Sequence, residues 1–207
     1  MAFPKWLTLL PHTVPRRITD PIVGVLARTG VTPNQLTVLG FLGNVGAGVL
    51  AARGEFLPAG LVMLAFASLD LLDGALARAT GRASAFGAVL DSTLDRLSEA
   101  AVLGGLIFYY ASRGDREEVV LCFVAITGSI VVSYVRAQAL ANGLDLRDGL
   151  FTRAERVLLL GGGLIISQIL RIILWILAIM SYATVLQRLY VAWGGLRGDR
   201  ADEEEAP

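Results

Sequence analysis

Four aspartates with helical spacing are the residues of this sequence best suited to chemistry. Asp70, Asp73, Asp91 and Asp95 lie within 26 residues, bracketed by apolar runs. Residues three or four apart share one face of a helix, so each pair presents two carboxylates to the same side. Two such helices facing one another would offer four oxygen ligands to a common point. Oxygen-only sets suit Mg²⁺ or Mn²⁺, and carboxylates next to hydrocarbon usually pair or bind ions, so the pattern predicts a site for two divalent ions.

Glycines and an arginine lie between the two carboxylate pairs. Gly74 and Gly87 have no Cβ and would let a ligand approach the backbone closely, and Arg78 could contact phosphate. An alternative is that the aspartates are helix caps and interfacial ion pairs with Arg78, Arg82 and Arg96. Caps have no reason to repeat on one face of two successive helices, so we favour the ion site.

The spacing of these residues resembles the signature of a known enzyme family. The pattern Asp70-x2-Asp73-Gly74-x2-Ala77-Arg78-x8-Gly87-x3-Asp91-x3-Asp95 is similar to that of the CDP-alcohol phosphotransferase family at all eight fixed positions. Members of that family displace CMP from a CDP-linked lipid with an alcohol. The resemblance covers nearly the whole chain, from Pro33-Asn34 to Gln187-Arg188.

The resemblance implies a role for each motif residue. Asp70, Asp73 and Asp91 would hold two Mg²⁺ or Mn²⁺ ions, and Asp95 would share in metal binding and act as the general base. The residues that would border the CDP moiety are Asn34, Thr37, Asp70, Gly74, Ala77, Arg78, Ser84 and Gly87. The resemblance also suggests a homodimer.

A second polar group predicts an acceptor that carries a phosphate. Its members, Ser133, Arg136, Arg153 and Arg188, fall on the same expected side of the membrane as the aspartates. Guanidinium groups suit bidentate phosphate recognition, although arginines also gather on the inner side of a membrane without any ligand.

The segments around these residues resemble the phosphatidylinositol-phosphate synthase branch of the family. The resemblance rests on Ser133-Tyr134-Val135-Arg136-Ala137 and on Gly149-x3-Arg153-Ala154-Glu155-Arg156, and it implies inositol phosphate as the acceptor. Leu150, Phe151 and Thr152 depart from the branch, so glycerol 3-phosphate remains the competing acceptor, as in a phosphatidylglycerophosphate synthase.

Two other classes of membrane protein also use acidic residues near lipid. An intramembrane prenyltransferase would need a second Asp-rich motif, but the aspartates after Asp95 all fall in expected loops or in the tail. A non-catalytic transporter would not require Gly74, Ala77, Arg78 and Gly87 at these offsets. We therefore expect an enzyme whose partners are a CDP-lipid, a phosphorylated polyol and membrane lipids, without nucleic acid.

The composition indicates an all-α integral membrane protein that would position this motif. Of the 207 residues, 55% are hydrophobic, and the mean hydropathy is +0.63. A single domain over residues 1–193 is expected to hold six transmembrane helices, at about 33–52, 56–79, 84–112, 119–142, 153–170 and 172–193. The only division between the last two is placed at Arg171. The single cysteine, Cys122, is expected to be a small buried hydrophobe.

The ends of the chain and the first span carry patterns of their own. An amphipathic interfacial helix is expected at 14–29, with Ile18, Ile22, Val25 and Leu26 on its apolar face. In the first span, Gly40, Gly43, Gly46 and Gly48 favour close helix packing. Residues 194–207 are expected to form a disordered acidic tail.

Basic residues are divided unequally between the two sides of this topology. The side of the motif holds fourteen, namely Lys5, Arg16, Arg17, Arg28, Arg78, Arg82, Arg96, Arg136, Arg147, Arg153, Arg156, Arg188, Arg197 and Arg200. The opposite side holds four, namely Arg53, Arg113, Arg116 and Arg171. Because cytoplasmic loops carry the excess of Lys and Arg, the active site and both termini are expected to be cytoplasmic.

Overall fold

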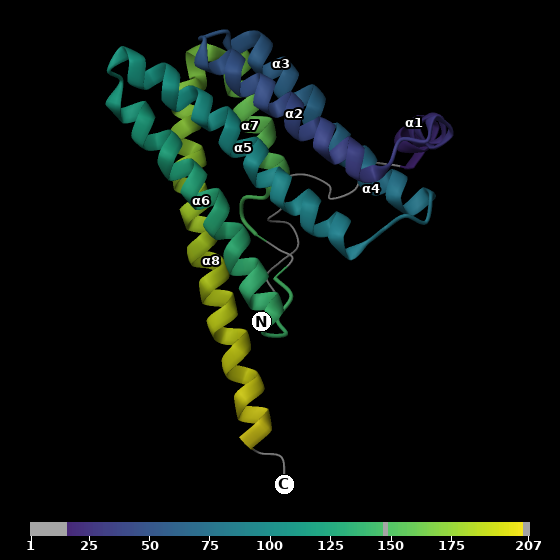
Figure 1. Ribbon diagram of the computed structural model, residues 1–207. Helices are drawn as coiled ribbons and strands as arrows, with labels where there is room; N and C mark the ends of the chain where they lie inside the picture. Colours follow the sequence, from purple (N-terminus) through teal and green to yellow (C-terminus); the bar gives the residue numbers. More distant parts are fainter. Residues whose placement is uncertain (1–15, 147–148, 205–207) are drawn as a thin grey trace.

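The computed structural model describes residues 16–146 and 149–204, and within these residues the chain is all-helical, without a strand. The helices are α1 (Arg16–Thr29), α2 (Pro33–Ala52), α3 (Phe56–Ala67), α4 (Leu69–Ala79), α5 (Ala85–Arg113), α6 (Arg116–Ala141), α7 (Arg153–Ile165), a 3₁₀ turn (Ser167–Ile169) and α8 (Leu170–Glu204) (Figure 1). The all-α class expected from the sequence is confirmed.

Four helical stretches in the described part of the chain are long and apolar enough to cross a membrane. They are Pro33–Ala52, Phe56–Ala79, Arg116–Ala141 and Ser167–Arg197, of 20 to 31 residues. α7 has 13 residues and is therefore about 20 Å long, shorter than the ~30 Å hydrocarbon layer. α5 carries charged motif residues in its first half. The expected count of six spans is thus not confirmed by length and composition.

The α2–α3, α5–α6 and α7–α8 turns gather at the end of the bundle opposite the motif (Figure 1). Phe56, after the α2–α3 turn, packs its ring 4.8 Å from that of Tyr109, near the α5–α6 turn. Arg171, in the first turn of α8, contacts Glu117, in the first turn of α6. The motif in α4 and the start of α5 therefore lies at the other end, together with α1 and the start of α7.

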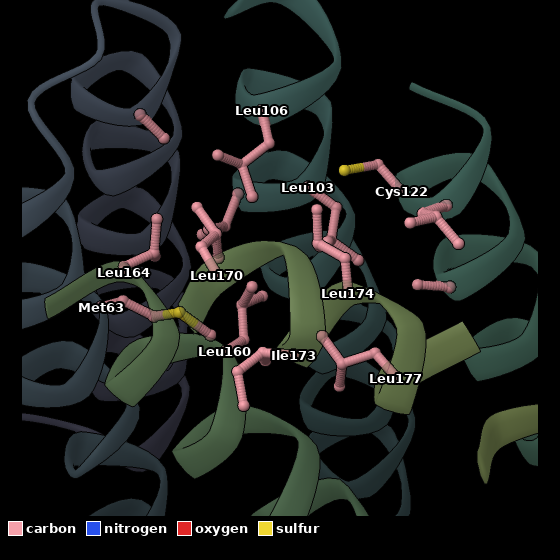
Figure 2. Packing of buried hydrophobic residues seen from close by; sticks show 14 of the residues in the cluster. Met63, Leu103, Leu106, Cys122, Leu160, Leu164, Leu170, Ile173, Leu174 and Leu177 are labelled. Carbon is pink, nitrogen blue, oxygen red and sulfur yellow. The ribbon is translucent and has the colours of Figure 1, made fainter. Parts of the chain in front are cut away.

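An apolar core joins the long helices. Figure 2 shows leucines of α5, α7 and α8 meeting Met63 of α3 and Cys122 of α6, and all of these side chains are buried. Cys122 is fully buried, which confirms its expected role as a small core residue. Large apolar side chains such as Phe108, Phe123 and Ile172 are instead exposed on the outside of the bundle, as in a protein that faces lipid.

Glycines let pairs of helices approach closely. A Cβ on Gly105 would lie 2.0 Å from the carbonyl oxygen of Gly48, so the backbones of α5 and α2 are in direct contact there. On α2, a Cβ at Gly40 or Gly43 would also clash with α4 or α3, as the sequence predicted, whereas Gly46 has nothing within 4 Å. Small residues thus set the packing distance of α2 against three helices.

The last two helices differ from expectation in where they meet. The turn expected at Arg171 is wrong: α7 ends at Ile165, Ile166 leaves the helix with φ −104° and ψ 72°, and α8 begins at Leu170. Arg171 lies in the first turn of α8, where its charge is balanced by ion pairs with Glu117 and Glu118. α8 also extends to Glu204, through residues that were expected to belong to the tail.

Contacts up to Arg197 support the first part of this extension of α8. A Cβ on Gly195 would lie 2.9 Å from Leu144 Cδ2, so the loop after α6 packs closely on α8 there. Arg197 lies over the ring of Trp193, with its Cζ 4.6 Å from the ring centroid. Residues 205–207 of the expected tail lie outside the described residues.

Two other expectations are refined by the structure. The second span is divided at Ser68, whose hydroxyl donates back to the carbonyl of Ala65 at 2.6 Å and separates α3 from α4. On α1, Val23 is buried against Leu36 and Leu76, whereas Val25 is 63% exposed. The face of α1 that packs on the bundle therefore includes Val23 and not Val25, which was expected on the apolar face. Residues 14 and 15 of the expected interfacial helix, with Lys5 and Arg147, lie outside the described residues.

Candidate active site

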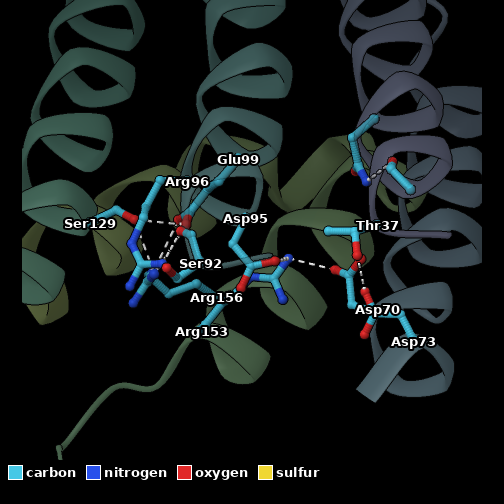
Figure 3. Close-up of polar contacts among 12 residues, drawn as sticks. Thr37, Asp70, Asp73, Ser92, Asp95, Arg96, Glu99, Ser129, Arg153 and Arg156 are labelled. Carbon is cyan, nitrogen blue, oxygen red and sulfur yellow. Dashed lines mark hydrogen bonds and ion pairs between the residues drawn. The ribbon is translucent and has the colours of Figure 1, made fainter. Parts of the chain in front are cut away.

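The two halves of the Asp motif meet because α4 and α5 both pack on α2. Asp73 interacts electrostatically with Asp91 and Asp70, and Asp95 interacts with the same two residues. The two halves of the motif therefore lie close enough to interact, although no three of the carboxylates form a ready ligand group within the described residues. In Figure 3, the guanidinium of Arg153 lies between Asp95 of α5 and Asp70 of α4, and Asp73 of α4 lies next to Thr37.

Helix α2 contributes polar groups and space to this site. A capping box between Thr32 and Gln35 starts the helix at Pro33, and it places Thr37 one turn later. The Thr37 hydroxyl donates to Asp73 Oδ2 at 2.6 Å and orients that buried carboxylate. At Gly40, a Cβ would lie 2.9 Å from Asp70 Oδ1, so this glycine makes room for the carboxylate.

Arg153 lies between the two halves of the motif. Its Nη2 atom is 2.6 Å from Asp70 Oδ2 and 2.7 Å from Asp95 Oδ1 (Figure 3). Arg153 is the first residue of α7, which begins with a capping box between Thr152 and Glu155. The positive end of that helix, together with the guanidinium, offsets the negative charge of the aspartates.

The donor set fits a divalent cation. All four candidate ligands are carboxylates, the hard oxygen donors that Mg²⁺ and Mn²⁺ prefer. They are also partly withdrawn from solvent: the side chains of Asp70 and Asp95 are 11% and 13% exposed, and Asp73 is 5% exposed. Within the described residues no three of them stand together as a ready ligand group, and Arg153 holds two of the four.

The residues expected to border the CDP moiety surround the same end of the bundle. Ser84 caps α5 by accepting a hydrogen bond from the Gly87 amide at 3.0 Å. A Cβ on Gly87 would lie 3.2 Å from Asn34 Oδ1, so Asn34, Ser84 and Gly87 form one group. Arg78 is exposed, with Nη1 3.4 Å from where a Cβ of Gly74 would lie, and Ala77 is half-buried beside it.

The residues expected to bind acceptor phosphate lie in two separate groups, one between α6 and α8 and the other at the start of α7. Arg188 is buried in α8 and donates to the Val132 carbonyl at 2.8 Å, next to Ser133, whose hydroxyl donates to the Ser129 carbonyl at 3.2 Å. Arg136 is exposed and lies within electrostatic reach of Arg188. The polar contacts of Arg153 are instead with the motif carboxylates.

A buried ion pair next to the site was not assigned from the sequence. Arg156 Nε lies 2.8 Å from Glu99 Oε1, and Arg156 Nη2 lies 3.1 Å from Glu99 Oε2 and 3.0 Å from Ser129 Oγ. Ser129 also donates to Glu99 at 2.7 Å. The signal was present, since Glu99 continues the four-residue series of Asp91 and Asp95, and Arg156 follows Arg153 by one turn.

Comparison with known proteins decides the family. The sequence profile described as CDP-alcohol phosphatidyltransferase matches residues 30–189. The chain belongs to the CDP-alcohol phosphatidyltransferase family. Its motif residues are therefore those of an integral membrane enzyme of this family, and the resemblance noted in the sequence is confirmed.

Relatives of this CDP-alcohol phosphatidyltransferase include two synthases of inositol-phosphate lipids. It is 38% identical over 187 residues to the phosphatidylinositol phosphate synthase of Mycobacterium marinum, covering 86% of this chain and 80% of the relative. It is 40% identical over 168 residues to the archaetidylinositol phosphate synthase of Pyrococcus horikoshii, covering 81% and 86%.

The fold is also that of a solved relative. The crystal structure of Mycobacterium tuberculosis phosphatidylinositol phosphate synthase with CDP-DAG bound matches with a TM-score of 0.80 and 37% identity, covering 86% of this chain and 94% of that one. A structure of the same synthase with manganese and citrate matches with a TM-score of 0.79 and 36% identity, covering 84% and 88%.

Proposed function

We propose that this CDP-alcohol phosphatidyltransferase transfers the phosphatidyl-type group of a CDP-linked lipid, such as CDP-diacylglycerol, to a hydroxyl of inositol phosphate and releases CMP. The observation that carries the proposal is the meeting of both halves of the Asp motif with Arg153, beside a second group of arginines. The names of the relatives support the same donor and acceptor.

We propose that Asp70, Asp73 and Asp91 hold two Mg²⁺ or Mn²⁺ ions, with Asp95 sharing in their binding. The oxygen-only donor set supports this assignment, as does the manganese in the structure of the mycobacterial synthase. When bound, such ions neutralise the pyrophosphate oxygens and the charge that develops on the departing CMP. Thr37 would keep the Asp73 carboxylate in a fixed orientation through its 2.6 Å hydrogen bond.

We propose that Asp95 is the general base of the transfer. It would accept the proton of the acceptor hydroxyl while the hydroxyl oxygen forms a bond to phosphorus and the bond from phosphorus to the CMP oxygen breaks. Its position one turn beyond Asp91 supports this role, because both carboxylates then reach one site while only one needs to be central to the ions.

We propose that the donor nucleotide lies against α2, α4 and the start of α5. Asn34, Thr37, Asp70, Gly74, Ala77, Arg78, Ser84 and Gly87 would border it. The clustering of Asn34, Ser84 and Gly87 supports the assignment, since a side chain at Gly87 would fill the space between the other two.

We propose that Arg136, Arg153 and Arg188 bind the phosphate of the acceptor, with Ser133 assisting. The mutual reach of Arg136 and Arg188 supports a common anion site. Phe151, one of the residues that depart from the pattern of the phosphatidylinositol-phosphate synthase branch, is 4% exposed within the apolar core, so this difference affects packing. Thr152, which also departs from that pattern, is the N-cap residue of α7, so this difference affects the start of the helix.

An acceptor screen on the purified protein tests the function. CMP release from CDP-diacylglycerol is measured with inositol 1-phosphate, glycerol 3-phosphate, free inositol and serine in parallel. We expect release with inositol 1-phosphate and little with free inositol, because the arginines would then have no phosphate to bind. Preferred use of glycerol 3-phosphate would assign the protein to the other synthase type, and equal use of inositol and its phosphate would refute the acceptor site.

We propose that α5 and α7 also cross the membrane, which makes six spans, that α1 lies at the interface, and that the active site and both termini are cytoplasmic. The fourteen-to-four division of basic residues supports this orientation. In a variant lacking Cys122, single cysteines at positions 82 and 113 are labelled with an impermeant thiol reagent. Labelling of position 82 from outside, instead of position 113, would overturn the orientation.

We propose that the enzyme is a homodimer, as the family resemblance suggests. Light scattering of the purified protein, corrected for bound detergent, measures the mass of the assembly. A mass near 22.0 kDa, that of one chain, would refute a stable dimer.

A further inference from the structure

Two ion pairs one helical turn apart connect α7 to α5. Arg153 and Arg156 lie three residues apart on α7, and Asp95 and Glu99 lie four apart on α5. The pairs are matched in order, Arg153 with Asp95 and Arg156 with Glu99 (Figure 3).

The two pairs differ in how firmly they are held. Both side chains of the Arg156–Glu99 pair are 4% exposed, and Ser129 bonds to each of them. The Arg153 side chain is 31% exposed, and its buried Nε has no hydrogen-bond partner within the described chain. The inner pair therefore anchors the start of α7, whereas the guanidinium of Arg153 can change partners by rotation of its side chain alone.

Arg153 also occupies the oxygens that a cation would need. One guanidinium nitrogen contacts a carboxylate from each half of the motif, Asp70 at 2.6 Å and Asp95 at 2.7 Å. An ion coordinated by these oxygens would displace the guanidinium and repel it by like charge. The displaced group would then need an anion, and phosphate is an anion that arginine binds well.

We propose that Arg153 is an internal counter-cation, which competes with divalent ions for Asp70 and Asp95 and is released to the acceptor phosphate when those ions bind. The proposal rests on the ion and acceptor assignments made under the proposed function. It makes binding ordered: the acceptor phosphate gains its third arginine only after the ions are in place. If Arg153 stayed permanently in the ion site or in the acceptor site, ion binding would not affect acceptor binding.

The first test measures ion affinity without any substrate. Mn²⁺ is titrated into the purified full-length protein in lipid nanodiscs, and free Mn²⁺ is followed by electron paramagnetic resonance. In Arg153→Gln, the charge-assisted hydrogen bond to Asp70 and the ion pair with Asp95 no longer oppose the ion. The variant should therefore bind Mn²⁺ about tenfold more tightly, or about 1.4 kcal/mol. Arg136→Gln removes the same charge from an exposed position and should change the affinity by less than about twofold.

Two outcomes of this titration would overturn the competition. One is an Arg153→Gln variant that binds Mn²⁺ no more tightly than the unmodified protein, and the other is an equal gain in Arg136→Gln. Arg153→Lys provides a second variant that keeps the charge and a long side chain. Its single ammonium lacks the fork of the guanidinium, so its Mn²⁺ affinity should lie between those of the other two proteins.

The second test separates release from competition. Binding of inositol 1-phosphate is measured by calorimetry with and without saturating Mn²⁺. The unmodified protein should bind it at least about tenfold more tightly with Mn²⁺, and Arg153→Gln should lose most of that gain. An affinity of the unmodified protein for inositol 1-phosphate that is the same with and without Mn²⁺ would refute the release of Arg153 to the acceptor phosphate. If the acceptor assignment alone is wrong, the Mn²⁺ shift in Arg153→Gln remains, so the two failures are distinguishable.

Discussion

The buried Glu99–Arg156 pair allows a quantitative prediction about stability. The Glu99 carboxylate accepts hydrogen bonds from Arg156 Nε, Arg156 Nη2 and Ser129 Oγ, at 2.7 to 3.1 Å. The substitutions Glu99→Leu and Arg156→Met each keep most of the side-chain volume and remove one charge. Each leaves the other charge buried without its partner, whereas the double substitution removes both charges.

The expected effects follow from the burial of the pair. Removing one partner of a buried ion pair costs about 3–5 kcal/mol, while replacing both with apolar groups is close to neutral. In a chain of this size each kcal/mol shifts the Tm by about 2–4 °C, so each single variant should lose about 6–20 °C. The double variant should lie within about 4 °C of the unmodified protein, on the same conversion.

Thermal unfolding in one detergent, followed by tryptophan fluorescence, measures all four proteins of the cycle. The pair Glu117–Arg171 is a matched control at the opposite end of the bundle, with side chains 43% and 58% exposed. Glu117→Gln should shift the Tm far less than Glu99→Leu, because solvent screens the exposed pair. If the losses of Glu99→Leu and Arg156→Met simply add in the double variant, the two charges do not stabilise one another and the reasoning is wrong.

Three further predictions concern the site and its support. Asp95→Asn should lower kcat by about 10²–10⁴-fold and weaken Mn²⁺ binding much less than Asp70→Asn does; equal loss of Mn²⁺ binding in both variants would refute a separate role for Asp95. Thr37→Val should weaken Mn²⁺ binding several-fold in the same titration, because its carboxylate partner loses a charge-assisted hydrogen bond. Gly105→Ala should sharply lower the Tm, since its Cβ would meet a backbone oxygen at 2.0 Å, while the adjacent Gly104→Ala, with nothing within 4 Å, should not.

The sequence by itself determined the features that depend on helical periodicity. The spacing of the aspartates specifies which carboxylates share a face, whatever the fold around them, and the motif is specific enough to indicate the family. Helix ends with local signals were also predictable: Gly30, with φ 77°, follows α1, and Gly143, with φ 86°, follows α6. Both are positions where a side chain would be strained.

Only the tertiary structure decided which distant groups meet. Arg153 lies 83 residues from Asp70 along the chain, and Arg156 lies 57 residues from Glu99. These pairs depend on how α7 packs against α3 and α8, which no local pattern specifies. The turn before α8 was misplaced for the same reason. Neither Gly nor Pro marks it, and Arg171, the charge that suggested a turn, is balanced within the helix by acidic residues of α6 that are distant in sequence.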